Sequence, residues 1–271
     1  MSAEIPLQWR NWLHENLISG VAPDQLVATM QANHFELTQI NGALMEMIRD
    51  IELRLESQNA FIPPDPCDGI GKPWSVVLQL RRPVVIQVYK DVLSSDECYK
   101  LIKAARHKLE PSYTISNETG ELQQHPHRTS SGTFLKRGES DLLRSLEARM
   151  SEIMNLPVGN GEDLQVLRYG IGAEYRPHYD YFPPENKGSD THMQRAGQRV
   201  ATLLLYLNDV EEGGETVFPE INFKVAPLKG TALYFSYYSQ GQVNPLSLHG
   251  GMPVIQGEKW VATKWKHEKP Y

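Results

Sequence analysis

Apolar side chains in the first sixty residues recur at steps of three and four, the spacing that lines one face of a helix. Three such runs begin near Trp9, Pro23 and Leu37. Gly20 suits the C-terminal cap of the first run, and Pro23 suits the first turn of the second. The third run extends to about Leu55. We therefore predict three amphipathic helices.

The pattern changes between Pro63 and Pro73, where four prolines and two glycines stand within eleven residues. This composition interrupts both helix and strand periodicity, so we predict a linker there. The predicted organisation is an N-terminal helical extension at 1–62, a linker at 63–73 and a larger domain at 74–271. The extension could serve in dimerisation or in docking a target, but bracing the larger domain is the favoured role.

Beyond the linker, short runs rich in β-branched residues are separated by Gly, Pro, Asn and Asp. Two predicted helices interrupt them, with Ser94 and Ser140 as caps. The polar segment 112–132 shows no period, and we interpret it as a long excursion, which in a compact domain is often functional. Many short strands of this kind predict an antiparallel sandwich or barrel. The predicted strands cover 74–80, 83–90, 164–170, 199–209, a stretch near Phe223, 231–237 and 259–267.

Composition narrows the class of protein without naming a chemistry. The 27 basic and 33 acidic residues give a net charge of −6, which argues against nucleic-acid binding through phosphates and against a basic membrane-surface helix. The longest apolar stretch, 200–207, is far too short to cross a bilayer, and the first residues do not form a secretory leader. Two cysteines, Cys67 and Cys98, cannot form a disulfide framework. We expect a soluble protein of the reducing cytoplasm, with no nucleic-acid or membrane partner.

One histidine pattern suggests a metal site. His178 and Asp180 stand two residues apart in RPHYDYF, and positions i and i+2 of a strand point to the same face. His249 follows much later in LSLHGGMPV, where two glycines would let backbone approach closely. Two histidines and one carboxylate on a small β-barrel are the donor set of non-haem Fe(II) oxygenases. A zinc hydrolase, or no metal at all, is the alternative.

A single lysine extends this interpretation. Lys259 lies ten residues after His249, at the start of a predicted strand. It is either a solvated surface residue or a cation in the barrel core, where it would need an anion as partner. Beside an iron site, the expected anion is a carboxylate of a bidentate keto-acid co-substrate.

From about Arg128 to Trp265 the chain resembles the catalytic domain of prolyl 4-hydroxylases (alpha-subunit-like), within the Fe(II)- and 2-oxoglutarate-dependent dioxygenases. The resemblance implies a mainly β, α+β fold: a double-stranded β-helix (jelly-roll or cupin-like) core with supporting helices. The matching words, in the family's order, are RTSSGTFL, LQVLRYGIGAEYRPHYDYF, GQRVATLLLYLNDVEEGGETVFP, PLKGTALYF, SLHGGMPVIQGEKW and ATKW.

The resemblance also assigns roles to individual residues. It implies that the iron ligands and catalytic residues are His178, Asp180 and His249. It implies that 2-oxoglutarate is held by Lys259, Tyr169, Thr216 and Trp265. It matches Tyr175 and Arg199 to positions that face a peptidyl substrate.

The implied activity is hydroxylation of proline in a peptide or protein, with Fe(II), 2-oxoglutarate, O2 and ascorbate as cofactors and succinate and CO2 as products. The 112–132 excursion would close over the substrate as a lid. A 2-oxoglutarate oxygenase acting on a free amino acid or another small molecule is the alternative, because its metal and co-substrate sites would be the same. A non-catalytic binding module is disfavoured by the intact candidate ligands, and a homodimer is a further expectation.

Overall fold

The structure is a computed structural model of the 271-residue chain. It describes residues 5–18, 21, 23–57, 65–67, 69–81, 84–115, 122–124, 128–186, 188–239 and 242–271. By internal packing the chain divides into two compact units, Met1–Ile62 and Pro63–Tyr271. The predicted cap Gly20 and part of the predicted linker, Pro63, Pro64 and Asp68, lie outside the described residues.

The N-terminal unit contains the three predicted helices, α1 (Leu7–Ile18), α2 (Pro23–Ala32) and α3 (Leu37–Ser57). Each pair of helices is in contact, and together they enclose a hydrophobic core of their own. Its most buried side chains are Leu13, Leu26, Met30 and Ile40. The unit therefore buries its apolar stripe within itself. Its predicted bracing role stays a prediction.

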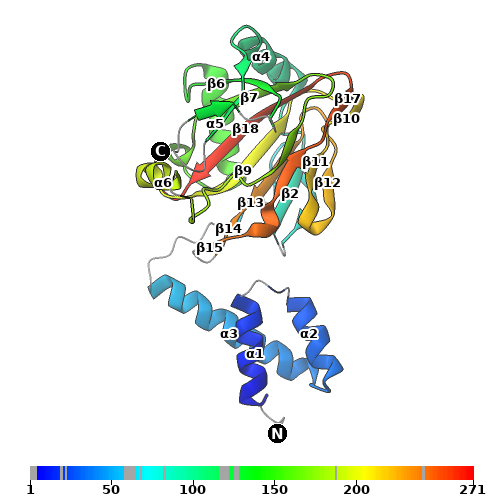
Figure 1. Ribbon diagram of the computed structural model, residues 1–271, viewed down its shortest axis with the longest axis vertical. Coiled ribbons are helices and arrows are strands. Elements are labelled where there is room, and N and C mark those ends of the chain that lie inside the picture. Colours follow the sequence, from blue (N-terminus) through cyan, green and yellow to red (C-terminus); the bar gives the residue numbers. More distant parts are fainter. Residues whose placement is uncertain are drawn as a thin grey trace. The chain divides into compact units, whose positions relative to one another are not determined.

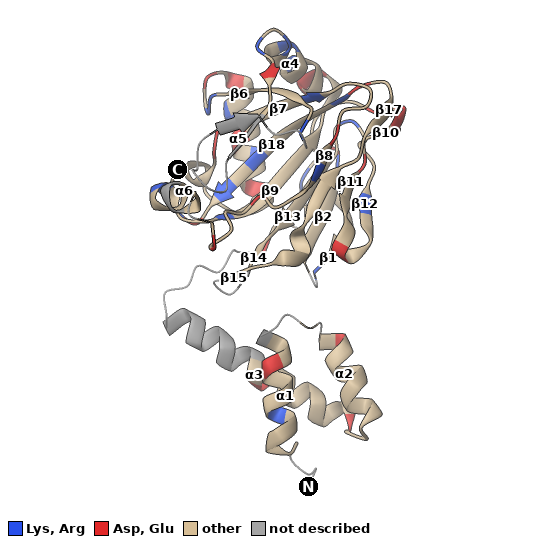
Figure 2. Cartoon of the chain, viewed as in Figure 1, with Lys and Arg blue, Asp and Glu red and all other residues tan. Residues whose placement is uncertain are grey.

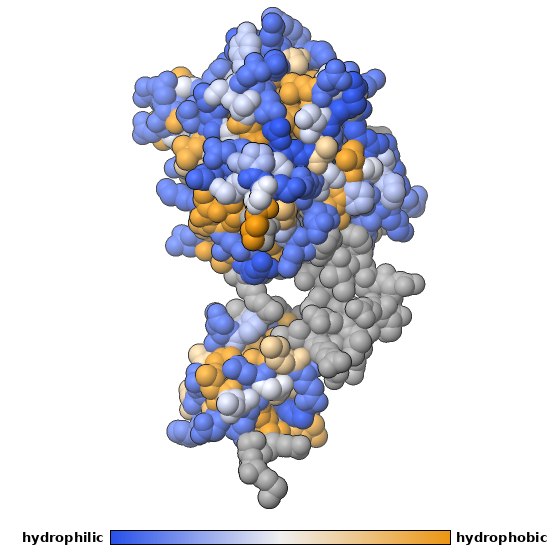
Figure 3. All heavy atoms as spheres, turned by 180° about the vertical axis from the view of Figure 1, so that it is seen from behind, coloured by the Kyte–Doolittle hydropathy of each residue, from blue (hydrophilic) through white to orange (hydrophobic). Residues whose placement is uncertain are grey.

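Some apolar side chains of this unit remain on its surface. Figure 3 shows orange spheres on one face of this unit, and the large exposed apolar side chains among its described residues are Leu7, Leu37 and Met45. Leu37 and Met45 are eight residues apart on α3, which places them near the same face of the helix. Within the described residues, no helix is both long and apolar enough to cross a membrane.

The larger unit is built from two antiparallel sheets (Figure 1). Every pair of neighbouring strands in both is antiparallel, as the short strands and turns predict. The eight-stranded sheet runs in the order β1 (Ser75–Leu80), β2 (Val85–Lys90), β13 (Ala232–Ser236), β9 (Arg199–Tyr206), β18 (Lys259–His267), β7 (Leu164–Tyr169), β6 (Ser131–Leu135), β3 (Glu110–Pro111). The four-stranded sheet runs β12 (Phe223–Val225), β11 (Thr216–Phe218), β16 (His249–Gly251), β8 (Tyr175–His178).

Residues from both sheets form one hydrophobic core cluster. Among its most buried members, Phe218 belongs to the four-stranded sheet, while Tyr206 and Phe235 belong to the eight-stranded one. This sandwich of two antiparallel sheets is consistent with the expected jelly-roll core. Three two-stranded ribbons complete it: β10 (Glu212–Gly213) with β17 (Val254–Gln256), β14 (Tyr238–Ser239) with β15 (Gln242–Val243), and β4 (Tyr113–Ile115) with β5 (Leu122–Gln124).

Two helices contact the large sheet, α4 (Ser95–Arg106) on β6 and β7, and α5 (Asp141–Met154) on β9. Both begin at the predicted serine caps. The Ser94 hydroxyl accepts the Glu97 amide at 3.2 Å while the Glu97 carboxylate accepts the Ser94 amide, a capping box. A third helix, α6 (Ser189–Ala196), lies in a polar stretch that shows no helix period. Short 3-10 turns cover Val158–Asn160, Pro219–Ile221 and Pro245–Ser247.

Strand β18 runs through the middle of the large sheet, and all nine of its residues are buried. Figure 2 shows basic positions along this strand. Lys264 and Lys266, which share a face, are compensated by polar partners: the Lys264 ammonium lies 2.7 Å from the Glu147 carboxylate of α5, and Lys266 donates to the Pro157 carbonyl at 2.6 Å. The alternate residues Lys259 and Trp265 point to the other side, into the space between the sheets.

The polar excursion at 112–132 contains a short hairpin in which β4 pairs with β5. Residues 116–121 and 125–127, which the lid hypothesis includes, lie outside the described residues. The excursion returns to the core at β6, which pairs with β7. A functional role as a lid stays a prediction.

Candidate active site

Three potential metal ligands converge on the inner side of the four-stranded sheet. His178 ends β8 and His249 begins β16, and the two histidines face each other directly across the strand pair. Asp180 does not lie on the same strand as His178, which corrects the sequence expectation: β8 ends at His178 and Asp180 follows in a bend. Two neighbours hold the bend, because Thr202 donates to the Asp180 carboxylate at 2.6 Å and Arg199 donates to its backbone carbonyl at 3.2 Å.

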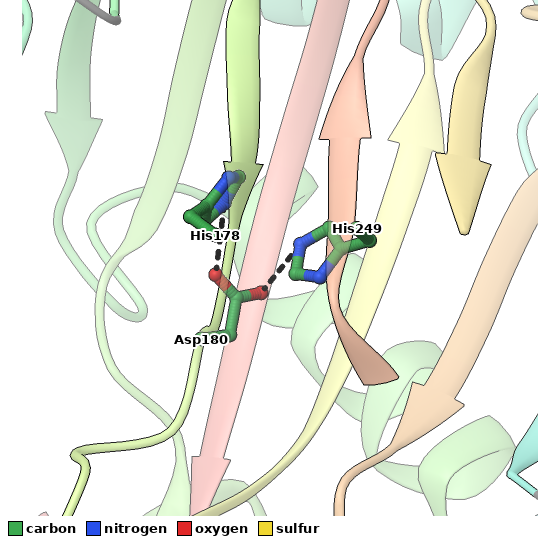
Figure 4. A group of neighbouring side chains, drawn as sticks. All are labelled: His178, Asp180 and His249. Atoms are coloured by element: carbon green, nitrogen blue, oxygen red, sulfur yellow. Dashed lines mark ion pairs between the residues drawn. The ribbon is translucent and has the colours of Figure 1, made fainter. Parts of the chain in front are cut away.

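The three side chains point toward one another (Figure 4). The His178 Nε2 lies 3.5 Å from Asp180 Oδ1, and the His249 Nε2 lies 3.5 Å from Asp180 Oδ2. Their donor atoms all lie within 4.8 Å of one another. Adjacent ligands at bond lengths of about 2.1 Å are separated by about 3 Å, so a small contraction would bring all three onto one ion.

Hydrogen bonds to the backbone present both histidines correctly for a metal. The Nδ1 of His178 lies 2.9 Å from the Arg176 carbonyl, and that of His249 lies 3.0 Å from the Ser247 carbonyl. Because a carbonyl only accepts, each Nδ1 carries the hydrogen, and each Nε2 offers its lone pair toward Asp180. This is the tautomer that a metal ligand requires.

Electrostatics favour the metal-binding protonation states. Burial by itself raises the pKa of Asp180, but the nearby His249 and His178 imidazoles and the Thr202 hydrogen bond bring it far below its usual range. Burial lowers the pKa of His249 to about 4, although the Asp180 charge acts in the opposite direction. Asp180 is thus an anion and His249 is neutral at pH 7, as metal ligation requires.

Gly250 allows the two histidine strands to approach. A Cβ at this position would lie 2.9 Å from the Tyr175 carbonyl oxygen and 3.0 Å from the Pro177 nitrogen, both backbone atoms that cannot move aside. Only glycine fits without a shift of one strand. The close approach that HGG suggests in the sequence is therefore present beside His249.

Lys259 lies inside the fold and not on its surface. Its side chain is 3% exposed, and it stands on β18 directly opposite Tyr169 of β7. Its ammonium lies 5.5 Å from the centre of the Tyr169 ring and 5.8 Å from that of Tyr206, and no ion pair to it is present among the described residues. Burial lowers the pKa of Lys259 to about 8, partly opposed by Glu215. A buried amine of this kind calls for an anionic ligand.

Other predicted co-substrate residues surround the same space. Thr216 of β11 is buried, and its hydroxyl accepts a hydrogen bond from the Tyr206 phenol at 2.8 Å. Trp265 is buried, and its indole Nε1 has no hydrogen-bond partner among the residues that the structure describes. An orphaned donor and an unpaired ammonium fit a carboxylate-bearing ligand, so the described residues suit 2-oxoglutarate beside a metal.

Tyr175, assigned by resemblance to the substrate side, covers the metal ligands. Its ring stacks on His178 with a centroid distance of 3.5 Å and an angle of 17°. The Arg128 guanidinium also lies against the Tyr175 ring, 4.7 Å from its centre. Burial raises the pKa of Tyr175 to about 12, so its phenol stays protonated. The predicted role toward substrate stays a prediction.

Arg199 is held by groups that the sequence analysis did not single out. Its guanidinium makes a two-point ion pair with Glu162, at 2.6 and 3.0 Å, and lies 4.2 Å from the centre of the Trp265 ring. His267 Nε2 lies 2.8 Å from the same carboxylate. Burial alone raises the pKa of Glu162, but Arg199 and His267 bring it down to about 2. The Arg199 charge is thus already compensated within the chain.

The sequence analysis also missed Thr202 and Tyr206, two polar groups on the apolar strand β9. Their even spacing places both on one face of that strand, and the structure places that face toward Asp180 and Thr216. Because buried polar groups are nearly always hydrogen-bonded, a threonine and a tyrosine within an apolar run are a sequence signal that each has a specific partner.

Comparison with known proteins agrees with this site. Residues 164–267 match the family model described as the 2OG-Fe(II) oxygenase superfamily, a range that contains β7 through β18 and every candidate ligand. The chain is 40% identical over 227 residues to "Probable prolyl 4-hydroxylase 3" of Arabidopsis thaliana, covering 75% of this chain and 77% of the relative. It is 39% identical over 220 residues to "Prolyl 4-hydroxylase 5" of the same plant, covering 74% and 73%.

A solved structure gives the same picture. The 2OG complex of the viral collagen prolyl hydroxylase of Paramecium bursaria Chlorella virus-1 is 30% identical, with a TM-score of 0.52, and covers 73% of this chain and 97% of that one. With a shared sheet arrangement, an intact two-histidine, one-carboxylate donor set and relatives at this identity, the chain belongs to the prolyl 4-hydroxylase family of Fe(II)- and 2-oxoglutarate-dependent oxygenases.

Proposed function

We propose that this protein hydroxylates proline residues within a peptide or protein. The observation that carries the proposal is the pairing of the His178, Asp180 and His249 cluster with a buried, unpaired Lys259 in the same space between the sheets. The choice of proline follows the family, whose Arabidopsis members above are named prolyl 4-hydroxylases. The reaction consumes prolyl substrate, 2-oxoglutarate and O2 and yields hydroxyproline, succinate and CO2.

The chain's own residues would divide the work. Bound iron and 2-oxoglutarate supply the oxidising chemistry. His178, His249 and Asp180 would hold the metal, while Lys259, Thr216 and the other residues around them would bind and orient the far carboxylate of 2-oxoglutarate. The buried aromatic side chains of the surrounding core would limit the access of water, which would strengthen each of these charge-based contacts.

The substrate side is where Tyr175 and Arg199 would act. Tyr175 stacks on the metal ligand His178, so its ring lies beside the metal site that a substrate would approach. Because the Glu162 carboxylate already compensates the charge of Arg199, the Arg199 side chain would offer the substrate hydrogen bonds and a fixed shape, not a free charge. The uncharged proline ring suits such an arrangement. The segment 112–132 would close over the bound chain.

The proposal is tested with iron-loaded protein, 2-oxoglutarate and a panel of proline-containing peptides. We expect succinate release to rise with peptide, together with a product about 16 Da heavier in which a proline carries the added oxygen. Free proline and other free amino acids are the comparison substrates. Turnover of free amino acids with no turnover of any peptide would reject the peptidyl substrate and favour the small-molecule alternative.

Three further expectations remain proposals. Ascorbate would keep the iron reduced between turnovers, and added ascorbate should then prolong activity. A homodimer would appear as twice the monomer mass in light scattering. We propose the reducing cytoplasm as the location of the protein, because its two cysteines, Cys67 and Cys98, are free thiols.

A further inference from the structure

The Asp180 carboxylate presents both oxygens to the metal ligands, and nothing in the histidine positions selects between them. Oδ1 lies 3.5 Å from His178 and Oδ2 lies 3.5 Å from His249. A carboxylate in this position can bind a metal through one oxygen or through both. The difference matters, because a two-oxygen Asp180 would occupy four of six positions together with the histidines, and one fewer would remain open.

A buried hydroxyl pair breaks this symmetry. Thr202 Oγ1 lies 2.6 Å from Asp180 Oδ2 and 3.2 Å from the phenolic oxygen of Tyr237. The carboxylate only accepts, so the one Thr202 hydrogen goes to Oδ2. Thr202 can then only accept from Tyr237, which uses the phenol hydrogen. The resulting chain runs in a single direction, from Tyr237 through Thr202 to Asp180.

The surrounding packing fixes this chain of hydroxyls. Thr202 is 1% exposed and Tyr237 is fully buried. Thr202 stands on β9 opposite Phe235 of β13, and the Tyr237 amide donates to the Val200 carbonyl on the same β9 strand. Both hydroxyls are shielded from bulk solvent, so Asp180 Oδ2 and the Tyr237 phenol are the partners that the structure offers to Thr202.

We propose that Thr202 is a positioning residue that makes Asp180 a one-oxygen metal ligand. The hydrogen bond draws electron density from Oδ2 and makes it the weaker metal donor, so Oδ1 binds the metal and three metal positions stay open. Two of these suit the keto acid and the third suits O2. The inference concerns the metal ligands and does not depend on which substrate is hydroxylated.

The experiment counts the open positions directly with Mn(II), a hard cation that suits carboxylate and water ligands. The relaxation of water protons by bound Mn(II) scales with the number of exchanging water ligands. In the Thr202→Val protein, which keeps the side-chain shape, we expect the relaxivity to fall to about two-thirds, because three open positions become two. Thr202→Ser keeps the hydroxyl and should retain the full value.

Further variants separate positioning from a general loss of structure. Thr202→Ala should show the same fall as valine, and it replaces valine if that protein does not fold. Tyr237→Phe keeps the Thr202 bond to Asp180 and should retain the full relaxivity. Equal relaxivity in the threonine, serine and valine proteins would overturn the proposal. Loss of Mn(II) binding by folded Thr202→Val would also overturn it, since a two-oxygen Asp180 should bind at least as tightly. No substrate is present, so failure of the substrate assignment cannot produce either result.

Discussion

Lys259→Met separates the functional role of this lysine from its effect on stability. The substitution keeps the length and apolar stem of the side chain but removes the ammonium. In the protein without ligand, the ammonium is buried with no ion-pair partner among the described residues, and its pKa falls from 10.5 to about 8. At 1.36 kcal/mol per pKa unit, keeping it charged at pH 7 costs the folded state about 3 kcal/mol.

The sign of this effect follows from the direction of the shift. A lysine whose folded pKa is lowered makes the folded state less favourable at neutral pH, and this cost disappears as the pH rises from about 8 toward 10.5. Removing the charge should therefore raise the stability of the ligand-free protein at pH 7, by up to about 3 kcal/mol less any packing loss. Urea-induced unfolding of both proteins, without metal or 2-oxoglutarate, measures this difference in the free energy of unfolding.

Binding should change in the opposite direction. In the complex, Lys259 pairs with a buried carboxylate, and removing one partner of such a pair costs about 2–5 kcal/mol. We expect the dissociation constant of 2-oxoglutarate to rise on the order of 100-fold, measured by calorimetry with the metal bound. Lys259→Arg keeps a cation and serves as the control. A methionine variant that is less stable and binds 2-oxoglutarate normally would refute this reasoning.

Three other predictions concern neighbouring residues. For the wild-type protein, the dissociation constant of 2-oxoglutarate should rise about tenfold per pH unit above pH 8 as free Lys259 loses its proton, and a flat profile would argue against a charged lysine. Gly250→Ala should cost about 1–3 kcal/mol and weaken metal binding by separating the histidine strands. Gly251→Ala, whose Cβ would meet nothing closer than 3.7 Å, should retain both stability and metal binding. Equal losses of metal affinity in the two variants would contradict the importance of the close approach at Gly250. The Glu162 carboxylate, with its pKa lowered to about 2, should stabilise the fold above about pH 4.5 and lose this effect as the pH falls from 4.5 to 2. Glu162→Gln should therefore flatten the dependence of the free energy of unfolding on pH in this range. An unchanged pH dependence would exclude the ion pair as its origin.

Local chemistry made part of the structure predictable. The strands Ser75–Leu80 and Val85–Lys90 follow from β-branched runs, and the serine caps of α4 and α5 follow from their residue types. The burial of Lys259 could not be settled by its spacing, because strand alternation does not say which face meets the second sheet. The family resemblance supplied that orientation, and the register opposite Tyr169 agrees with it.

The remaining features depend on contacts between distant segments. Asp180 leaves the strand because Thr202 and Arg199, some twenty residues later, hold the bend. The pairing of Arg199 with Glu162 joins residues 37 positions apart, and no local pattern encodes it. Helix α6 has a polar sequence, and the buried residues described within it, Ser189 and Ala196, are small, so hydrophobic periodicity could not reveal it.

The most direct test of the central claim is the stoichiometry of a coupled turnover at one metal centre. Iron-loaded protein is supplied with 2-oxoglutarate, O2 and a peptide that the panel identifies as a substrate, and succinate and hydroxyproline are quantified in the same sample. We expect equal amounts of both products from the wild-type protein, and neither product from the Asp180→Ala protein. Hydroxyproline formed by the Asp180→Ala protein at the wild-type rate, or formed without succinate, would contradict it.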